Sequence, residues 1–297
     1  MKADLYQSVT RLIVQQLEQG VRPWMQPWHG DQAGDRIVRP LRVTGQPYKG
    51  INVLMLWSAA MTKGYGAPIW LTFKQACDLK AHVRKGEHGS LVVYADRMTR
   101  AATDRDTGEE TERSIPFLKS YTVFNVEQID GLPEHFYAKP EPKGEPVARL
   151  AHADAFFAAT GATIVHGGSR ACYVMQTDNI HLPCIDFFRD AESYYATLAH
   201  EASHWTRHPS RLNREFGRKR WGDEGYAMEK LVAELGAAFL CADIALTPEV
   251  REDHAAYIAS WIKVLHHDKR AIFAAAAHAQ RAADFLHGVP NTAAEAA

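Results

Sequence analysis

The chain has 297 residues and a formal net charge of −1, because 34 Lys and Arg nearly balance 35 Asp and Glu. Hydrophobic residues make up 46% of the chain and charged residues 23%, proportions that exclude a disordered or fibrous protein. The balance hides a polarity: residues 1–100 carry 14 basic and 7 acidic residues, whereas residues 101–297 carry 20 basic and 28 acidic residues. We therefore expect two domains of opposite charge.

The first predicted domain, residues 1–137, mixes helices and strands. Apolar residues at helical spacing from Leu5 to Leu17 predict an amphipathic helix and not a signal peptide, so we expect a cytoplasmic protein with no membrane partner. Prolines and glycines predict an irregular segment over residues 20–47. The further predicted elements are helices at 48–61 and 72–82 and strands at 90–94 and 119–126, joined by an exposed polar hairpin segment at 99–114.

A linker is predicted at residues 138–147, where three prolines, a glycine and four charges occur with almost no apolar side chain. The second domain, residues 148–297, is predicted to be mainly α-helical with a small β-sheet, so the fold class is α+β. Its predicted elements are helices at 148–160 and 225–240, strands at 163–166, 171–176 and 179–182, a helix start at Thr247-Pro248-Glu249, and an alanine-rich helical run to Leu286.

The cysteines do not suggest chemistry. They lack Cys-x-x-Cys spacing and lie in apolar settings, so we expect neither a cysteine metal site nor a disulfide framework. Most are predicted to be inert core residues, and the four positions are Cys77, Cys172, Cys184 and Cys241.

The segment TLAHEASHWT contains His200, Glu201 and His204 in the pattern HExxH. On a helix, residues i and i+4 share a face, so both imidazoles can reach one cation while Glu201 lies beside the open coordination position. Zinc held by three protein ligands lowers the pKa of a bound water to about 7, and the carboxylate can take its proton. The pattern predicts a zinc site suited to peptide-bond hydrolysis, which Mn or Co could also occupy. The alternative is a pair of surface or capping histidines.

The helix predicted at residues 225–240 offers two candidates for the third ligand, Glu229 and Glu234. Helical angles place them on opposite flanks of the buried stripe, so angle alone barely discriminates between them. Glu229 shares its flank with Ala233 and Gly236, where two helices can approach closely, and we prefer it as the ligand. Glu234 is then a partner that orients a ligating imidazole, a solvated flank residue, or the alternative ligand.

Basic and aromatic residues are interleaved in the first domain, as single-stranded nucleic acid requires: cations contact phosphates and flat rings stack on bases. Trp70 also fits an apolar pattern, so a place in the core is the alternative for it. The candidate DNA-binding residues are Arg36, Arg39, Arg42, Tyr48, Lys49, Trp70, Lys74, Arg84 and Lys85.

Longer segments give a more specific match than HExxH alone. The sequence closely resembles the ArdC-type plasmid antirestriction proteins, whose N-terminal region also occurs in TraC-type plasmid primases. The resemblance covers nearly the whole chain. It is carried by TGQPYKGINVLML, WLTFKQA, VRKGEHG and YTVFNVEQIDGLP in the first domain, and by YYATLAHEASHWT, HPSRLNR and YAMEKLVAELGAAFL in the second.

The resemblance implies an N-terminal single-stranded DNA-binding domain and a C-terminal zincin-like metallopeptidase domain. It also implies metal ligands at His200, His204 and Glu229, a general base at Glu201, and a role in protecting incoming conjugative plasmid DNA from restriction. Two alternatives stay open. The chain can be a metallopeptidase that acts on proteins, including host restriction enzymes or other DNA-bound proteins, or a non-catalytic DNA-binding protein whose metal only stabilises the fold.

Overall fold

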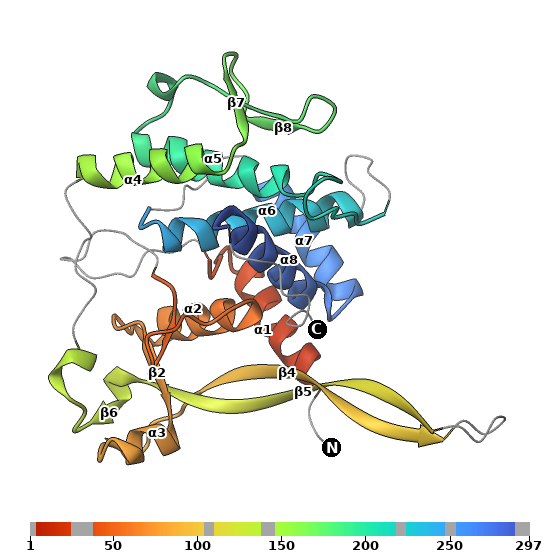
Figure 1. Cartoon of the computed structure of the whole chain (residues 1–297). Helices are drawn as coiled ribbons and strands as arrows, with labels where there is room; N and C mark the ends of the chain where they lie inside the picture. The colour runs from red at the N-terminus through yellow and green to blue at the C-terminus, as the bar shows by residue number, and fades with distance from the viewer. Residues whose placement is uncertain are drawn as a thin grey trace.

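The structure is a computed structural model, and it describes residues 4–24, 38–103, 110–137, 146–217, 224–246 and 254–288. An α+β region (residues 4–137, the N-terminal region) precedes a mainly helical region with a small sheet (residues 146–288, the C-terminal region) (Figure 1). The predicted fold class is therefore confirmed. Within the described residues, no helix combines the length and the apolar character that a membrane crossing requires.

The N-terminal region begins with helix α1 (Leu5–Glu18), which Asp4 caps by accepting a hydrogen bond from the Gln7 backbone. The helix predicted at residues 72–82 is shorter than expected, because Lys80 takes a left-handed backbone conformation just after it. The other elements are β1 (Leu41–Arg42), α2 (Ile51–Lys63), β2 (Ile69–Thr72), α3 (Phe73–Asp78), β3 (His82–Val83), β4 (Ser90–Thr103), β5 (Glu110–Asn125) and β6 (Ile129–Asp130).

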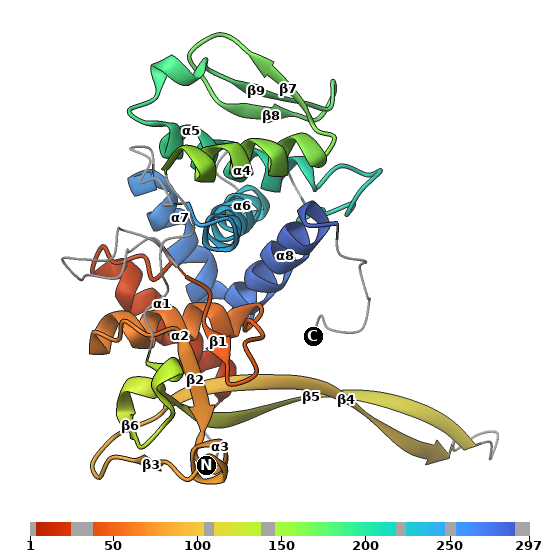
Figure 2. The same ribbon diagram turned by 60° about the vertical axis from the view of Figure 1, so that its left-hand side comes forward.

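The N-terminal sheet has the strand order β1-β2-β5-β4. Strands β4 and β5 are antiparallel, with a register that runs from Ser90 opposite Val123 to Thr103 opposite Glu110. They project from the body as a long two-stranded arm (Figure 1 and Figure 2). The predicted hairpin is confirmed. Its strands are longer than predicted, because the outer half of the arm is polar and lacks the apolar alternation that reveals a half-buried strand.

The C-terminal region places its sheet over α4 and α5 (Figure 2). The strand order is β7-β9-β8, with β7 parallel and β8 antiparallel to β9, so β8 is an edge strand. The helix start predicted at Thr247 lies outside the described residues. The elements are α4 (Pro146–Ala159), β7 (Thr163–His166), β8 (Cys172–Val174), β9 (Asn179–Leu182), α5 (Ala191–Trp205), α6 (Glu224–Asp243), α7 (His254–His267) and α8 (Ala271–Leu286).

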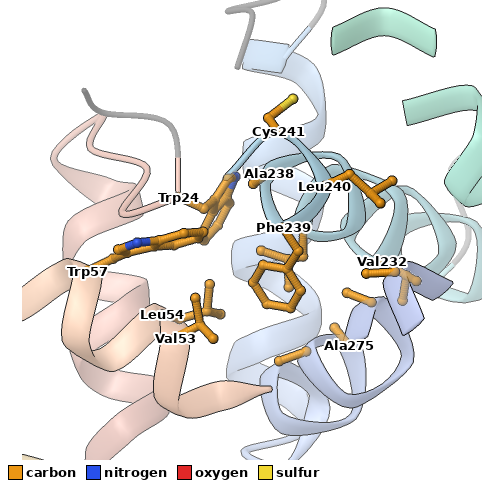
Figure 3. Packing of buried hydrophobic residues seen from close by; sticks show 14 of the residues in the cluster. Trp24, Val53, Leu54, Trp57, Val232, Ala238, Phe239, Leu240, Cys241 and Ala275 are labelled. Carbon is orange, nitrogen blue, oxygen red and sulfur yellow. The ribbon is translucent and has the colours of Figure 1, made fainter. Parts of the chain in front are cut away.

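One continuous hydrophobic core joins the two regions. Helix α1 packs against α7 and α2 packs against α8. Trp24, Leu54 and Trp57 of the N-terminal region lie beside Phe239 and Ala275 of the C-terminal region (Figure 3). The two predicted domains therefore share one core, and a second, smaller cluster lies within the N-terminal region alone. Helix α2 is apolar around most of its circumference, and the small N-terminal sheet leaves much of it to be covered by other helices.

The cysteines differ from their prediction. Only Cys241 is buried, and burial raises the pKa of its thiol. The predicted core location is wrong for Cys77, Cys172 and Cys184, which are exposed. Apolar neighbours in the sequence do not bury a residue whose element lies at the edge of the protein, as the short helix α3 and the edge strand β8 do.

Candidate functional site

Helix α5 carries both histidines of the HExxH motif. The helix is capped at its start by Asp190, which accepts a hydrogen bond of 2.7 Å from the Ser193 backbone, and residues 193–205 are all buried. His200 and His204 lie one turn apart, with ring centroids separated by 5.0 Å. The sequence therefore brings two imidazoles together inside the protein, where polar groups need specific partners.

Glu201 points towards the edge strand β8. Its Oε2 accepts a hydrogen bond of 2.9 Å from the Tyr173 backbone N–H, and the carboxylate is buried. The Tyr173 hydroxyl donates to Asp178 at 2.9 Å, and burial raises its pKa to about 12. Arg211 binds both Asp178 and the backbone carbonyl of Trp205, which ties the strand to the end of α5. An edge strand therefore lies beside the HExxH motif.

Glu229 of α6 contacts His204 directly. Its Oε1 lies 2.9 Å from His204 Nδ1, and the Arg214 guanidinium donates to both carboxylate oxygens, each at 2.9 Å. All three side chains are buried. Burial raises the pKa of Glu229, but His204 and Arg214 outweigh it and hold the pKa at about 2, so the carboxylate is ionised at neutral pH. Arg214 was not a sequence candidate, although it lies in the HPSRLNR segment.

The other ring nitrogen of His204, Nε2, is buried without a hydrogen-bond partner among the described residues. Because Nδ1 faces the ionised Glu229, it carries the proton and Nε2 keeps its lone pair, which is the arrangement of a metal-ligating histidine backed by a carboxylate. Burial above all, with the charge of Lys230, lowers the pKa of His204 and favours the neutral imidazole that binds metals.

The donor set fits a divalent metal ion, since two imidazoles and nearby carboxylates are suitable ligands for zinc and for other first-row divalent ions. In the part of the chain that the structure describes, no three His, Cys, Asp or Glu side chains already converge as a complete cluster. The donors are instead engaged in pairs, His204 with Glu229 and His200 with Glu234.

Glu234 lies beside His200, with Oε2 at 3.6 Å from its Nδ1. The Trp24 indole N–H donates to Glu234 Oε1 at 3.4 Å, and the Arg22 guanidinium lies 3.6 Å from the same oxygen. Arg22 and Trp24 belong to the N-terminal region, which therefore reaches a carboxylate of this site. Sequence reasoning missed both residues, because nothing local to them signals a partner on α6.

Helices α5 and α6 approach closely at Gly236. A Cβ at this position would lie 2.5 Å from Ser203 Oγ, closer than any side chain can be accommodated without movement. Ala233, on the same flank, is fully buried. The close approach predicted for this flank is confirmed, and it brings the carboxylates of α6 to the histidines of α5.

Three of the DNA-binding candidates are buried. Tyr48 and Trp70 belong to the hydrophobic core. Arg39 forms a two-bond ion pair with Asp243 of α6, at 2.8 and 2.9 Å, and its guanidinium lies 4.3 Å from the Phe239 ring centroid. The structure thus corrects the expectation for these three residues, because they pack within and between the two regions and do not face an open surface.

The remaining candidates in the described residues are exposed; Arg36 lies outside those residues. Exposed ion pairs link Lys74 to Asp78 and Arg84 to Glu87, at 2.7 and 2.9 Å. Such pairs contribute only about 0–1 kcal/mol, so a phosphate can compete for these cations. The exposed candidates are Arg42, Lys49, Lys74, Arg84 and Lys85.

Known proteins match each region and the chain as a whole. A family model described as the N-terminal domain of anti-restriction factor ArdC matches residues 3–124, and one described as a zincin-like metallopeptidase matches residues 151–278. An uncharacterised protein of Sinorhizobium fredii (strain NBRC 101917 / NGR234), y4eC, is 43% identical over 98% of this chain and 94% of its own length. DNA primase TraC of Escherichia coli is 39% identical over 96% of this chain, which spans 27% of the primase.

Two solved structures of the antirestriction protein ArdC from plasmid R388 have the same fold. The metal-free structure matches with a TM-score of 0.80 at 48% identity, and the Mn(II)-bound structure with a TM-score of 0.76 at 44% identity. Each match covers 96% of this chain and 97% of the ArdC chain. The buried HExxH helix, the zincin-like match and this full-length similarity agree, and the chain belongs to the ArdC family of antirestriction proteins.

Proposed function

We propose that the chain binds single-stranded DNA through its N-terminal region and protects plasmid DNA entering a recipient cell during conjugation from restriction. Its C-terminal region binds a divalent metal ion through His200, His204 and Glu229, with Glu201 as general base. The observation that supports a metal ion here most directly is the buried Nε2 of His204, which has no hydrogen-bond partner among the described residues, while Glu229 contacts the opposite nitrogen, Nδ1. The DNA part is supported by similarity to an ArdC N-terminal domain and to a DNA primase.

A bound divalent ion supplies Lewis acidity and lowers the pKa of a coordinated water to about 7. Zinc suits two imidazoles and a carboxylate, and Mn is the alternative, since a relative is known in a Mn(II)-bound form. The residues of this chain orient the reactants. Glu201, buried and anchored by the Tyr173 backbone, accepts and returns the proton. The edge strand β8 offers backbone groups to an extended peptide.

Glu229 is our proposed third ligand. It lies on the α6 flank that closes against α5 at Gly236, and Arg214 helps to keep its carboxylate ionised. In this structure its Oε1 contacts His204 Nδ1 and an Arg214 nitrogen, so coordination beside Nε2 requires the carboxylate to leave the Nδ1 edge of the ring. The alternative assigns coordination to Glu234 and leaves Glu229 to orient the His204 ring.

The exposed cations of the N-terminal region are the proposed phosphate contacts. A gel-shift comparison of single- and double-stranded DNA at two salt concentrations tests this part. We expect preference for the single strand and weaker binding at the higher salt concentration, since released counterions contribute to binding. Equal binding of both strands, or affinity independent of salt, would contradict the proposal.

The role of the metal is tested by Glu201→Gln in plasmid transfer into restricting and non-restricting recipients, with metal content measured in parallel. If Glu201 is the base, the variant keeps the metal and loses protection in the restricting recipient only. If protection is kept along with the metal, the second candidate holds, in which the metal stabilises the fold of a non-catalytic DNA-binding protein. Cleavage of DNA-bound host proteins by the wild type, and not by Glu201→Gln, identifies a peptidase.

A further inference from the structure

The N-terminal region places two side chains, Trp24 and Arg22, beside the proposed metal site. Trp24 is fully buried and belongs to the core formed with α6 and α7, where its ring lies edge-on to Trp261. Figure 3 shows Trp24 next to Trp57, with its indole nitrogen turned towards the helix that carries Ala238. That nitrogen donates to Glu234 Oε1 at 3.4 Å. The indole is therefore a core residue and also a polar partner of Glu234.

Arg22 supplies the charge that a buried carboxylate needs. Its guanidinium lies 3.6 Å from Glu234 Oε1, and its side chain is 11% exposed. Glu234 is itself buried, and its second oxygen lies 3.6 Å from His200 Nδ1. An ionised carboxylate at this depth is stable only with charged and hydrogen-bonding partners, and two of these come from residues 21–24 of the N-terminal region.

We propose that Arg22 and Trp24 are positioning residues of the metal centre, which act on His200 through Glu234. The inference rests on the proposed metal site. Residues 151–278, which match the zincin-like family, do not include these two positions. On this proposal, the metal affinity of the C-terminal region depends on the N-terminal region. Thermodynamic linkage is reciprocal, so a metal ion bound at His200 should in turn stabilise the position of residues 21–24. In the sequence, these residues directly precede the segment that contains Arg36.

The experiment measures Zn²⁺ and Mn²⁺ affinity of the full chain by competition with a chelating dye. Trp24→Phe keeps the aromatic ring and removes the donor, and Arg22→Gln removes the charge. Trp57→Phe is the matched control, because this buried indole donates at 2.8 Å to the Val38 carbonyl and not to a carboxylate of the site. A second arm repeats Trp24→Phe in a Glu234→Gln background, and thermal unfolding without metal checks that every variant is folded.

Removing a direct partner of a metal ligand costs roughly 10- to 100-fold in affinity, and these residues are one contact further away, so we expect about 3- to 10-fold for Trp24→Phe and for Arg22→Gln. Trp57→Phe should leave affinity unchanged, and Trp24→Phe should add nothing in the Glu234→Gln background. Equal losses in Trp24→Phe and Trp57→Phe, or an undiminished loss in the Glu234→Gln background, would overturn the inference. Unchanged affinity in His200→Ala would instead overturn the proposed metal site itself.

Discussion

The α5–α6 site and the N-terminal surface both contain ion pairs between a basic and an acidic side chain, but in opposite environments. At the site, the Arg214 side chain is 1% exposed and binds both oxygens of Glu229. On the N-terminal surface, the Lys74 side chain is 82% exposed, and its pair with Asp78 joins neighbouring turns of one short helix. A buried pair is costly to break because the remaining charge loses its only counterion, whereas an exposed pair is replaced by water. Burial, and not residue type, decides whether a charge here supports the architecture or remains available to a ligand.

The largest effect is expected for Glu229→Ala, which leaves Arg214 buried without its carboxylate. We expect the free energy of unfolding to fall by about 3–5 kcal/mol in metal-free protein, measured by urea denaturation. Metal content, measured by mass spectrometry on protein purified at equal concentration, should fall further than in Glu234→Ala.

Glu234→Ala serves as the control, since it removes the other buried carboxylate of α6 and keeps the Arg214 pair. Greater metal loss in Glu234→Ala than in Glu229→Ala would make Glu234 the third ligand and assign Glu229 to orienting His204. Equal stability of the two variants would mean that the contacts of Glu234 with Arg22 and Trp24 contribute as much as the Arg214 pair.

The junction between the two regions is expected to show the next largest effect. Arg39→Ala removes the two-bond pair with Asp243, which is partly accessible to water, so we expect a loss of about 2–3 kcal/mol. Because one core joins the regions, unfolding should stay a single transition that moves as a whole to lower urea concentration. Two separate transitions in the variant would mean that the regions retain independent cores.

The same junction predicts a dependence on pH. Burial raises the pKa of Asp243, but the charges of Arg39 and His287 lower it by more, so the net pKa lies below that of a free Asp. A group with a lowered native pKa contributes stability above its unfolded pKa and loses it as the pH falls through the native value. Stability measured by urea denaturation should therefore decline less steeply below pH 4 in Asp243→Asn than in wild type, where about 3.9 is the unfolded pKa.

The features that could be predicted from the sequence are those set by residues close together in the chain. The i, i+4 interval of His200 and His204 fixes their shared helix face, and the Thr163–Leu182 strands follow from local β-branched and apolar content. Partners across long separations were not predictable. Asp243, the partner of Arg39, lies 204 residues away, and Trp24 meets Glu234 across 210 residues. Arg39 is a charged residue in a segment predicted to be irregular, which indicates a surface position. Only the structure reveals its partner on α6.

A moderate effect is expected where α5 and α6 meet. Gly236→Ala places a methyl group 2.5 Å from Ser203 Oγ, and overpacking of this kind costs about 1–3 kcal/mol. The double variant Gly236→Ala with Ser203→Ala removes the hydroxyl and should recover part of the loss in thermal unfolding. No recovery would mean that the hydroxyl is not the source of the strain, which then lies in the 3.0 Å contact with the Cβ of residue 203 or in the backbone of α6.

The smallest change in stability, within about 0.5 kcal/mol, is expected for Lys74→Glu combined with Lys85→Glu, because both side chains are exposed and the pair of Lys74 with Asp78 is weak. The effect on DNA should be larger. Each lost phosphate contact lowers the slope of log affinity against log salt by about 0.7 for single strands, so the double variant should bind more weakly and less salt-dependently. Lys263→Glu, an exposed lysine of α7, is the control for net charge. Loss of DNA binding to the same extent in the control would mean that DNA responds to the net charge of the whole molecule. The contrast between buried ion pairs at the α5–α6 site and exposed cations on the N-terminal surface would then not explain where DNA binds.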